Sequence, residues 1–323
     1  MKKVVDDIRL MIKVCDMYYN QECSQQKIAS ELNLSRPTVS RLLSSAREQG
    51  IVKITISDLD EIRYWELERD LEKRFGLAEM LITESSADVD ETNDLIGRMA
   101  GRYITKKIRN GTIVGVSMGR TLHQMVTHVR KPDATDVVFV PLIGGMGQLQ
   151  TQLHANSIAE DLAQVYGGTF VPFHAPARVS SRKMRDELMK EESLAGAVNM
   201  MKHLDMALVG IGYPNEYSSI TATGYFDESA IERLKERNVA GDICMQFFDE
   251  NGSTSTYRIE NNVIGIDINT LTKVSSCVGI AGGMDKLKAI RGAIRGGYIN
   301  RLITDVDCAK ALMEDEDTPA LKA

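Results

Sequence analysis

The sequence predicts an α/β protein of two domains, in which an N-terminal helix-turn-helix, winged-helix-like domain precedes a larger domain built on a parallel sheet. Three observations support this prediction. A chain of 323 residues exceeds the length of one typical domain. Its first fifty residues show helical periodicity. From Gly76 onward, apolar β-rich runs alternate with helical stretches, which is typical of a parallel sheet covered on both faces. We therefore expect domains at 1–57 and 76–323, joined by a linker helix at 58–75.

Composition and charge exclude several classes of protein. The five cysteines are odd in number, scattered and without a CxxC pair, so neither a disulfide framework nor a metal site is indicated and a reducing cytoplasm fits best. No apolar run of about eighteen residues and no basic-then-apolar leader occurs, so we expect no membrane span and no export. Residues 1–57 hold nine Lys or Arg and six Asp or Glu, a net charge of +3, which leaves −9 for the rest of a chain whose total is −6. Any nucleic-acid contact is therefore expected in residues 1–57.

Three helices are expected in the first fifty residues. Apolar residues recur at spacings of three and four over 4–20, the period of one helical face. Ser24 can cap a second helix, and Ser35, after a tight turn, can cap a third that ends at Gly50. Pro37 is tolerated in the first turn of the third helix, because its missing N–H would have no partner there.

The third helix carries side chains suited to DNA. Its apolar stripe, Val39, Leu42, Leu43 and Ala46, faces inward, so the polar side chains of its first two turns face outward. Guanidinium groups grip phosphates or guanine edges, and short hydroxyls fit a major groove about 12 Å wide. A solvated polar face on a small bundle is the alternative. The short turn between the helices favours helix-turn-helix DNA binding, and the β-rich run at 51–56 can form a short wing. The predicted DNA contacts are Ser35, Arg36, Thr38, Ser40, Arg41 and Ser44.

The linker helix at 58–75 leaves two interpretations open. Tyr64, Leu67, Leu71 and Phe75 recur at helical spacing within a highly charged stretch. Such a helix either packs on its own domain or pairs with another subunit.

Six β-rich runs predict the strands of the second domain, and several of them end in glycine. Ligands of parallel sheets collect at the carboxyl ends of the strands, so the glycine-ended runs outline one site. The runs are 79–83, 112–117, 136–145, 169–173, 206–212 and 275–283.

The run IVGVSMGRTL, residues 113–122, looks like a strand that leads into a phosphate-binding turn. Glycine lets backbone N–H groups approach an anion, the Ser and Thr hydroxyls donate hydrogen bonds, and the N-terminus of a following helix adds a favourable dipole. An ordinary strand-to-helix turn is the alternative.

Taken in order, these segments resemble the SorC family of bacterial transcriptional regulators, which is often grouped with the deoxyribonucleoside and central glycolytic gene regulators. The resemblance covers nearly the whole chain. It implies an effector domain similar to the sugar-phosphate isomerase and glucosamine-phosphate deaminase fold, a phosphorylated sugar or related effector, and a homotetramer on operator DNA. The matching segments include YYNQECSQQKIASELNLSRPTVSRLLSSAREQGIVKI, VGVSMGRTL, VPLIGGMG, HANSIAEDLA, APARVSS, DMALVGIG, AGDICMQFFDENG and VGIAGGMDKLKAIRGAIRGGYINRLITD.

The resemblance also implies an effector site, residue by residue. The family's phosphate-binding turn falls on Ser117, Gly119, Arg120 and Thr121. Gly144 and Gly145 come beside the site, and His154 and Asn156 match positions that contact ligand or shape the pocket. Asp242 matches an acidic position that holds sugar hydroxyls, and Lys286 matches a lysine that faces the phosphate. The alternatives are a structural role for His154, a capping role for Asp242 and a solvated Lys286.

One position departs from the family. Some relatives carry Lys or Arg directly before the glycine pair, and in the deoxyribose-phosphate responder that lysine forms a Schiff base. This chain has Ile143 there, which cannot form an imine. We therefore expect neither deoxyribose 5-phosphate nor fructose 1,6-bisphosphate to be handled as in those relatives.

The predicted function is control of a carbohydrate or polyol operon by a non-covalently bound phosphorylated effector, without a cofactor. Such control requires the effector to bind the DNA-competent and incompetent arrangements with different affinity. Repression and activation both stay open. A phosphosugar isomerase or deaminase fused to a DNA-reading head is the alternative, although no compact acid/base constellation is evident. A DNA-binding architectural protein with a vestigial ligand domain is a third.

Overall fold

The computed structural model describes residues 8–52, 63–130, 132–147, 150–215, 219–255, 257 and 262–314. The chain divides into two compact units, residues 1–63 and 64–323.

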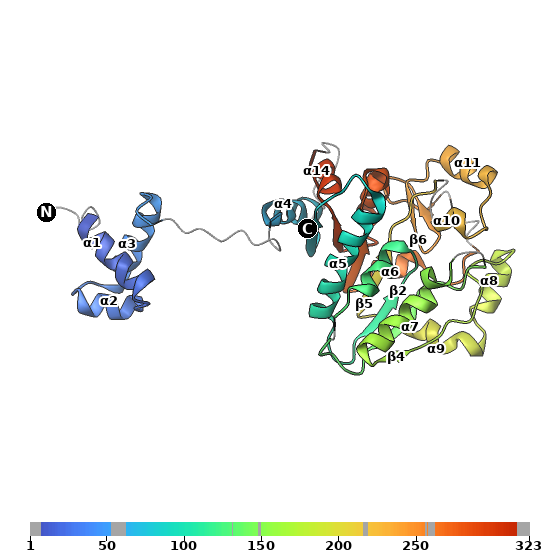
Figure 1. Cartoon of the computed structure of the whole chain (residues 1–323), viewed down its shortest axis with the longest axis horizontal. Coiled ribbons are helices and arrows are strands. Elements are labelled where there is room, and N and C mark those ends of the chain that lie inside the picture. Colours follow the sequence, from blue (N-terminus) through green and yellow to red (C-terminus); the bar gives the residue numbers. More distant parts are fainter. Residues whose placement is uncertain are drawn as a thin grey trace. The chain divides into compact units, whose positions relative to one another are not determined.

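Helices form the described part of the first unit (Figure 1). They are α1 (Ile8–Cys15), which continues as the π-helical turn η2 (Asp16–Asn20), α2 (Gln25–Glu31) and α3 (Arg36–Glu48). The Ser24 Oγ accepts a hydrogen bond from the Lys27 N–H, and the Ser35 Oγ accepts one from the Thr38 N–H, so both predicted caps are confirmed. The predicted wing falls on 51–56, of which 53–56 lie outside the described residues.

The apolar core of this unit fixes which face of α3 is outward. The predicted stripe is buried, and it packs against Met11, Val14 and Ile28 of the two preceding helices. Asn33 turns the chain between α2 and α3 with a φ of 50°, and the Leu34 N–H donates to the Ala29 carbonyl. This short turn is the helix-turn-helix connection expected from the sequence.

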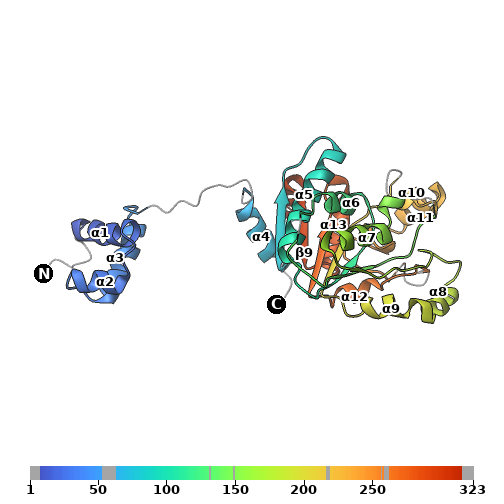
Figure 2. The ribbon, with the colours of Figure 1, turned by 60° about the horizontal axis from the view of Figure 1, so that its bottom comes forward.

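A seven-stranded parallel sheet forms the centre of the second unit (Figures 1 and 2). Its strand order is β1-β9-β8-β5-β2-β3-β4. All six predicted strands are present, in most cases shorter than predicted. The seventh, β9, and an antiparallel hairpin of β6 and β7 were not predicted. The bounds are β1 (Glu79–Thr83), β2 (Ile113–Val116), β3 (Val138–Pro141), β4 (Thr169–Phe170), β5 (Met206–Gly210), β6 (Gly241–Ile243), β7 (Gln246–Phe248), β8 (Ser276–Ile280) and β9 (Arg301–Asp305).

The two faces of the sheet have separate apolar cores, because successive residues of a strand point to opposite sides. In β5, Leu208 belongs to one core, whereas Ala207 and Val209 belong to the other. Three helices that pack side by side cover the Leu208 face (Figure 2). They are α5 (Val89–Lys107), α6 (Arg120–Thr127) and α7 (Ala155–Tyr166).

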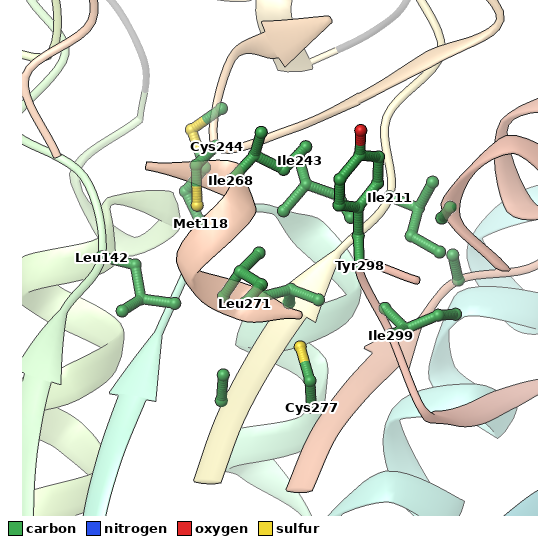
Figure 3. Close-up of a cluster of buried hydrophobic side chains, with 14 of the residues drawn as sticks. Met118, Leu142, Ile211, Ile243, Cys244, Ile268, Leu271, Cys277, Tyr298 and Ile299 are labelled. Atoms are coloured by element: carbon green, nitrogen blue, oxygen red, sulfur yellow. The ribbon is translucent and has the colours of Figure 1, made fainter. Parts of the chain in front are cut away.

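The opposite face carries the larger core, part of which is drawn in Figure 3, where Leu271 lies between Leu142 and Ile299. Buried side chains of many further elements join this core. These elements include α4 (Trp65–Phe75), α9 (Glu192–Met201), α11 (Glu228–Glu236), α12 (Ile268–Leu271), α13 (Leu287–Arg295) and α14 (Val306–Glu314). The remaining short helices are η4 (Thr151–Leu153), α8 (Arg182–Leu188), α10 (Ser219–Ala222) and η6 (Met284–Lys286).

Helix α4 begins at Trp65, so the predicted start of the linker helix at residue 58 is not observed; residues 63–64 form a turn, and 58–62 lie outside the described residues. The helix packs on its own unit through the buried Leu71 and Phe75. The Glu68 and Glu72 carboxylates accept hydrogen bonds from the N–H groups of Ile82 (2.8 Å) and Met80 (2.7 Å) in β1. Because β1 is an edge strand, α4 satisfies N–H groups that the sheet leaves unpaired.

Among the described helices, none is both long and apolar enough to cross a membrane. The five cysteines are free and buried.

Candidate functional site

A cavity of about 390 Å³ opens at the carboxyl ends of β2, β5 and β8. Its walls come from the turns that follow these strands, from the first turns of α5 and α6, and from the β6–β7 hairpin. Parallel α/β sheets bind ligands at this edge, as the glycine-ended runs predicted. The polar or charged lining residues are Asp88, Asp90, Asn93, Ser117, Arg120, Thr121, Tyr213, Asn215, Asp242, Asp285 and Lys286.

The turn after β2 has the shape expected from the sequence, but its hydrogen bonds are partly used within the protein. Gly119 has a φ of 123°, which side-chain-bearing residues rarely adopt, and its N–H donates to the Leu153 carbonyl (3.1 Å). The Ser117 Oγ is buried and accepts from the Gly210 N–H (3.0 Å), which ties together the ends of β2 and β5. Ser117 therefore stabilises the turn through its hydrogen bond with the Gly210 N–H.

Helix α6 begins inside the cavity wall at Arg120, and its N-cap residue, Gly119, provides no side-chain cap. The first N–H groups of an α-helix have no acceptor within the helix, and the helix dipole concentrates partial positive charge there. An anion in the cavity can accept hydrogen bonds from these N–H groups and is attracted by the partial positive charge. The Arg120 side chain is exposed at the same end.

Two glycines of α5 allow α6 to approach closely. A Cβ on Gly97 would lie 2.7 Å from the Gln124 Cβ, and one on Gly101 would lie 2.8 Å from the Met125 carbonyl oxygen. At the cavity end of the same contact, the Thr121 hydroxyl donates to the Asn93 Oδ1 at 2.9 Å, and both residues are buried. The α5 helix thereby fixes the start of α6.

Asp242 is a buried carboxylate in the cavity wall. Its Oδ2 accepts from the Met245 N–H (3.0 Å), whereas its Oδ1 has no hydrogen-bond partner among the described residues. Burial raises the pKa of Asp242 to about 7, against the opposing effects of the Met245 N–H and the Lys286 charge. Gly212 must be a glycine, because a Cβ there would lie 2.1 Å from the Asp242 Oδ1. The cavity wall thus contains a buried acceptor that has no hydrogen-bond partner among the described residues.

Lys286 enters the cavity from η6 and is partly buried. Its pKa is lowered by burial first and also by the neighbouring Arg120 charge, while Asp285 and Asp242 oppose the shift. Two cations that repel one another are stabilised when an anion lies between them.

The glycine pair that precedes Lys286 is held by Asp305 at the end of β9. The Asp305 Oδ2 accepts from the Gly283 N–H (2.7 Å), and its Oδ1 accepts from the Asp307 and Cys308 N–H groups. Sequence reasoning did not single out Asp305, although an aspartate directly before a helix is a capping signal.

The structure brings six of the ten predicted effector residues into the cavity wall: Ser117, Gly119, Arg120, Thr121, Asp242 and Lys286. The other four lie outside the lining described above. Gly144 and Gly145 donate their N–H groups to the carbonyls of Ile264 and Ala175, and a Cβ on Gly144 would lie 2.5 Å from the Ala175 oxygen. Backbone packing therefore requires glycine at 144, whereas a Cβ on Gly145 would lie 3.9 Å from the Ala175 oxygen, an ordinary contact.

The remaining two residues lie at the start of α7. His154 occupies the N-cap position, directly after the Leu153 carbonyl that binds Gly119. The Asn156 side chain is bonded to both the N–H (2.9 Å) and the carbonyl (3.3 Å) of Phe173. Roles of these residues in ligand contact stay predictions.

Asn93, Tyr213 and Cys244 line the cavity but were not predicted from the sequence. Burial raises the pKa of the Cys244 thiol, so this cysteine is neutral and is no activated nucleophile.

The DNA-facing prediction agrees with exposure on α3. Arg36, Ser40 and Arg41 are exposed, and Thr38 and Ser44 are partly exposed. The Ser35 and Thr38 hydroxyls lie 2.8 Å apart within the cap, so they order the start of the helix. Base and phosphate contacts of these side chains stay predictions.

Comparisons with known proteins identify the class of both units. Residues 61–314 match the model described as "Putative sugar-binding domain", and residues 12–65 match that of a Crp-like helix-turn-helix domain. The sorbitol operon regulator of Klebsiella pneumoniae is 33% identical over 313 residues, covering 96% of this chain and 99% of the relative. The deoxyribonucleoside regulator of Bacillus subtilis is 32% identical over 317 residues, covering 95% and 98%.

Comparison with solved structures points to the same class of protein. The crystal structure of the full-length Klebsiella pneumoniae sorbitol operon regulator matches with a TM-score of 0.72 at 32% identity, covering 96% of this chain and 99% of that one. A DeoR family transcriptional regulator from Listeria monocytogenes matches with a TM-score of 0.70 at 27% identity, covering 77% and 99%.

The fold and these matches define a DNA-binding transcriptional regulator with a sugar-binding domain, and not an enzyme, since the curated relatives are regulators. The chain belongs to the SorC/DeoR-type family of sugar-binding transcriptional regulators. The family resemblance of the sequence is thereby confirmed.

Proposed function

We propose that this regulator controls a carbohydrate or polyol utilisation operon and that a phosphorylated sugar or polyol, bound non-covalently in the cavity at the ends of β2, β5 and β8, changes its affinity for the operator. The observation that carries the proposal is the polarity of this cavity. Arg120, Lys286 and the uncapped start of α6 offer donors and positive charge, and Asp242 offers an unpaired buried oxygen. A ligand with a phosphate and several hydroxyl groups complements both.

The phosphate is expected at the start of α6. Hydrogen bonds from backbone N–H groups and a fixed dipole favour an anion there without moving the protein. Lys286 adds a point charge on a flexible side chain, and Arg120 adds a planar fork of donors. The glycine at position 119 leaves this end open, because nothing lies within 4 Å of the space that a Cβ would occupy.

The hydroxyl groups are expected near Asp242. A carboxylate accepts hydrogen bonds from two neighbouring hydroxyls, and one oxygen of Asp242 is already bonded to the Met245 N–H. The other oxygen is enclosed by the cavity wall and has no partner among the described residues, and we propose that a ligand hydroxyl becomes that partner. A buried acceptor without a partner costs about 1–3 kcal/mol, so a hydroxyl that satisfies it contributes to affinity.

Position 143 supports the proposal that binding is non-covalent. Ile143 is fully buried and bridges Gly265, and its side chain has no amine that can condense with a sugar carbonyl. Residue 143 therefore cannot form a Schiff base with the effector.

The effector acts only if it prefers one DNA-binding state of the protein over another. We propose that this preference passes through a homo-oligomer, a tetramer as in the family resemblance. Light scattering coupled to size-exclusion chromatography, with and without operator DNA, measures the oligomeric state; a monomer under both conditions contradicts this part of the proposal.

The test of the proposal is a thermal unfolding screen followed by DNA binding. Ligand binding to the folded state raises the unfolding midpoint, by an amount that grows with ligand concentration over Kd. Because the relatives include a sorbitol operon regulator and a deoxyribonucleoside regulator, the panel begins with sorbitol 6-phosphate and deoxyribose 5-phosphate, each beside its unphosphorylated form.

A compound that raises the midpoint is then titrated against the protein on an operator selected from random duplex DNA. We expect a phosphorylated sugar or polyol to bind saturably and to change operator affinity. Turnover of a panel compound, or binding of the unphosphorylated forms alone, would contradict the proposal.

A further inference from the structure

Asn93 occupies the part of the cavity wall where α5 meets the start of α6. It lies in the first turns of α5, its exposed fraction is 6%, and it lines the cavity beside Thr121. The close contact at Gly97, one helical turn further along α5, holds the two helices at a fixed spacing. The position of Asn93 relative to the start of α6 is therefore set by packing.

The hydrogen bond between Thr121 and Asn93 changes what each residue can offer to a ligand. A hydroxyl group carries one proton, and the Thr121 hydroxyl donates it to the Asn93 Oδ1. While this bond exists, Thr121 cannot donate to an anion. The Asn93 Nδ2, which carries two protons, makes no hydrogen bond with the described residues.

Either assignment of the amide leaves a donor for the cavity. If the amide were turned around, Nδ2 would donate to the Thr121 oxygen and the Thr121 proton would become available to a ligand. The Asn93–Thr121 pair is thus a neutral donor unit next to the helix N-terminus. It carries no negative charge, whereas Asp88 and Asp90, which line the cavity from the start of the same helix, are carboxylates.

We infer that Asn93 is a specificity-determining contact of the effector site: its side-chain amide donates a hydrogen bond to the anionic group of the ligand, and its neutrality is what admits that anion beside Thr121. This inference rests on the proposed function, because it takes the ligand to be phosphorylated. It assigns to Asn93 the direct contact that the sequence assigned to the Thr121 hydroxyl.

The substitution Asn93→Asp tests the inference with almost no change of shape. The carboxylate still accepts the Thr121 proton, but it replaces the amide donor with a negative charge that faces the ligand's phosphate. A hydrogen bond to a charged group contributes about 1.5–3 kcal/mol, and each 1.4 kcal/mol is a factor of ten, so affinity is expected to fall at least about tenfold. Asn199→Asp is the matched control, because Asn199 is exposed on α9 and receives the same change of charge.

Both variants and the wild type are titrated with inorganic phosphate and with sorbitol 6-phosphate by calorimetry. The expected result is a loss of at least about tenfold for Asn93→Asp with both probes, and no change for Asn199→Asp. Binding of either probe by Asn93→Asp with wild-type affinity would overturn the inference and leave the proposed function standing. A wild-type protein that binds neither probe, nor any other phosphorylated compound of the panel, overturns the proposed function and this inference with it.

Folding is checked by circular dichroism. If Asn93→Asp does not fold, Asn93→Ala replaces it, since this variant removes the donor without adding charge. We expect Asn93→Ala to weaken binding of sorbitol 6-phosphate by about fivefold to a hundredfold. A folded Asn93→Ala with wild-type affinity also overturns the inference.

Discussion

Asp242 is a carboxyl group whose burial has a measurable consequence for stability. Its pKa is raised from the ordinary value to about 7 because burial disfavours the charged form. The folded state therefore holds the proton more tightly than the unfolded chain does. This contribution to stability is fully present below the unfolded pKa and is lost as pH rises through about 7.

We expect Asp242→Asn to remove this pH dependence. The variant has no charge to bury, so its free energy of unfolding exceeds that of the wild type above pH 7 and differs little near pH 4. Urea unfolding of both proteins at several pH values measures the difference. A wild-type stability that stays flat between pH 5 and pH 8 would show that the carboxyl group does not titrate in this range.

Lys286 is expected to contribute to phosphate binding. Lys286→Met keeps much of the side-chain volume and removes the charge, and together with Thr121→Val it should weaken the response to a phosphorylated effector by about tenfold or more. Operator binding without effector should not change. A double variant that responds at the same effector concentration places the phosphate elsewhere.

At the level of elements, the contact between α5 and α6 depends on glycine. Gly97→Ala would place its Cβ 2.7 Å from the Gln124 Cβ and 2.9 Å from the Gln124 carbonyl carbon, so the helices must separate. We expect a loss of about 1–3 kcal/mol in the free energy of unfolding, together with weaker effector binding, because the start of α6 moves. Chemical denaturation and ligand titration measure the two effects.

Gly196→Ala is the control for this prediction. Gly196 lies within α9, and no atom lies within 4 Å of the space that its Cβ would fill. Alanine favours the helix by about 0.5–1 kcal/mol over glycine, so this variant is expected to be slightly more stable. If both alanines had the same effect, close packing at Gly97 would not be the cause.

The sequence predicts elements well where periodicity is strong and local. The apolar stripe of α3, the caps at Ser24 and Ser35 and six of the strands depend on neighbouring residues, and all were predicted. The place of Asn93 in the cavity wall could not be predicted from the sequence. It depends on the contact between α5 and the start of α6, in which Asn93 and Thr121 are 28 positions apart in the chain.

The β6–β7 hairpin was missed for a local reason. The strands of the β6–β7 hairpin are short, and Cys244 and Met245 form the hairpin turn with φ values of 52° and 59°, a conformation usually associated with Gly or Asn. No turn signal therefore marks it in the sequence. Asp242 was predicted as a site residue from the family resemblance, whereas its unpaired oxygen and raised pKa appear only once the hairpin is placed against Gly212.

For the whole molecule, the two units are expected to perform separable tasks. Arg36→Ala with Arg41→Ala removes two exposed guanidinium groups from α3, and each contact of this kind with a base contributes about 1–3 kcal/mol. Affinity for the selected operator should fall about 30-fold or more, while the affinity for effector stays the same. Fluorescence anisotropy and calorimetry measure the two quantities.

Arg47→Ala is the control on the same helix, because Arg47 is exposed in the last turn of α3, away from the end that we expect to enter the groove. It should change operator affinity much less. An unaltered gel shift for the double variant would contradict the assignment of α3 as the recognition helix.

The hydrogen bonds of Asp305 connect the effector cavity to elements of the same unit that lie outside it. Asp305 accepts a hydrogen bond from Gly283 in the loop that leads to Lys286. It is also the last residue of β9, which pairs with β1 in the sheet. The β1 strand is in turn held along its free edge by Glu68 and Glu72 of α4. Hydrogen bonds and strand pairing thus connect the loop, β9, β1 and α4, and α4 is the first described helix of this unit in the chain. If the effector binds Lys286 as we propose, it contacts a loop that these hydrogen bonds connect to α4, the first described helix after the DNA-binding unit in the chain.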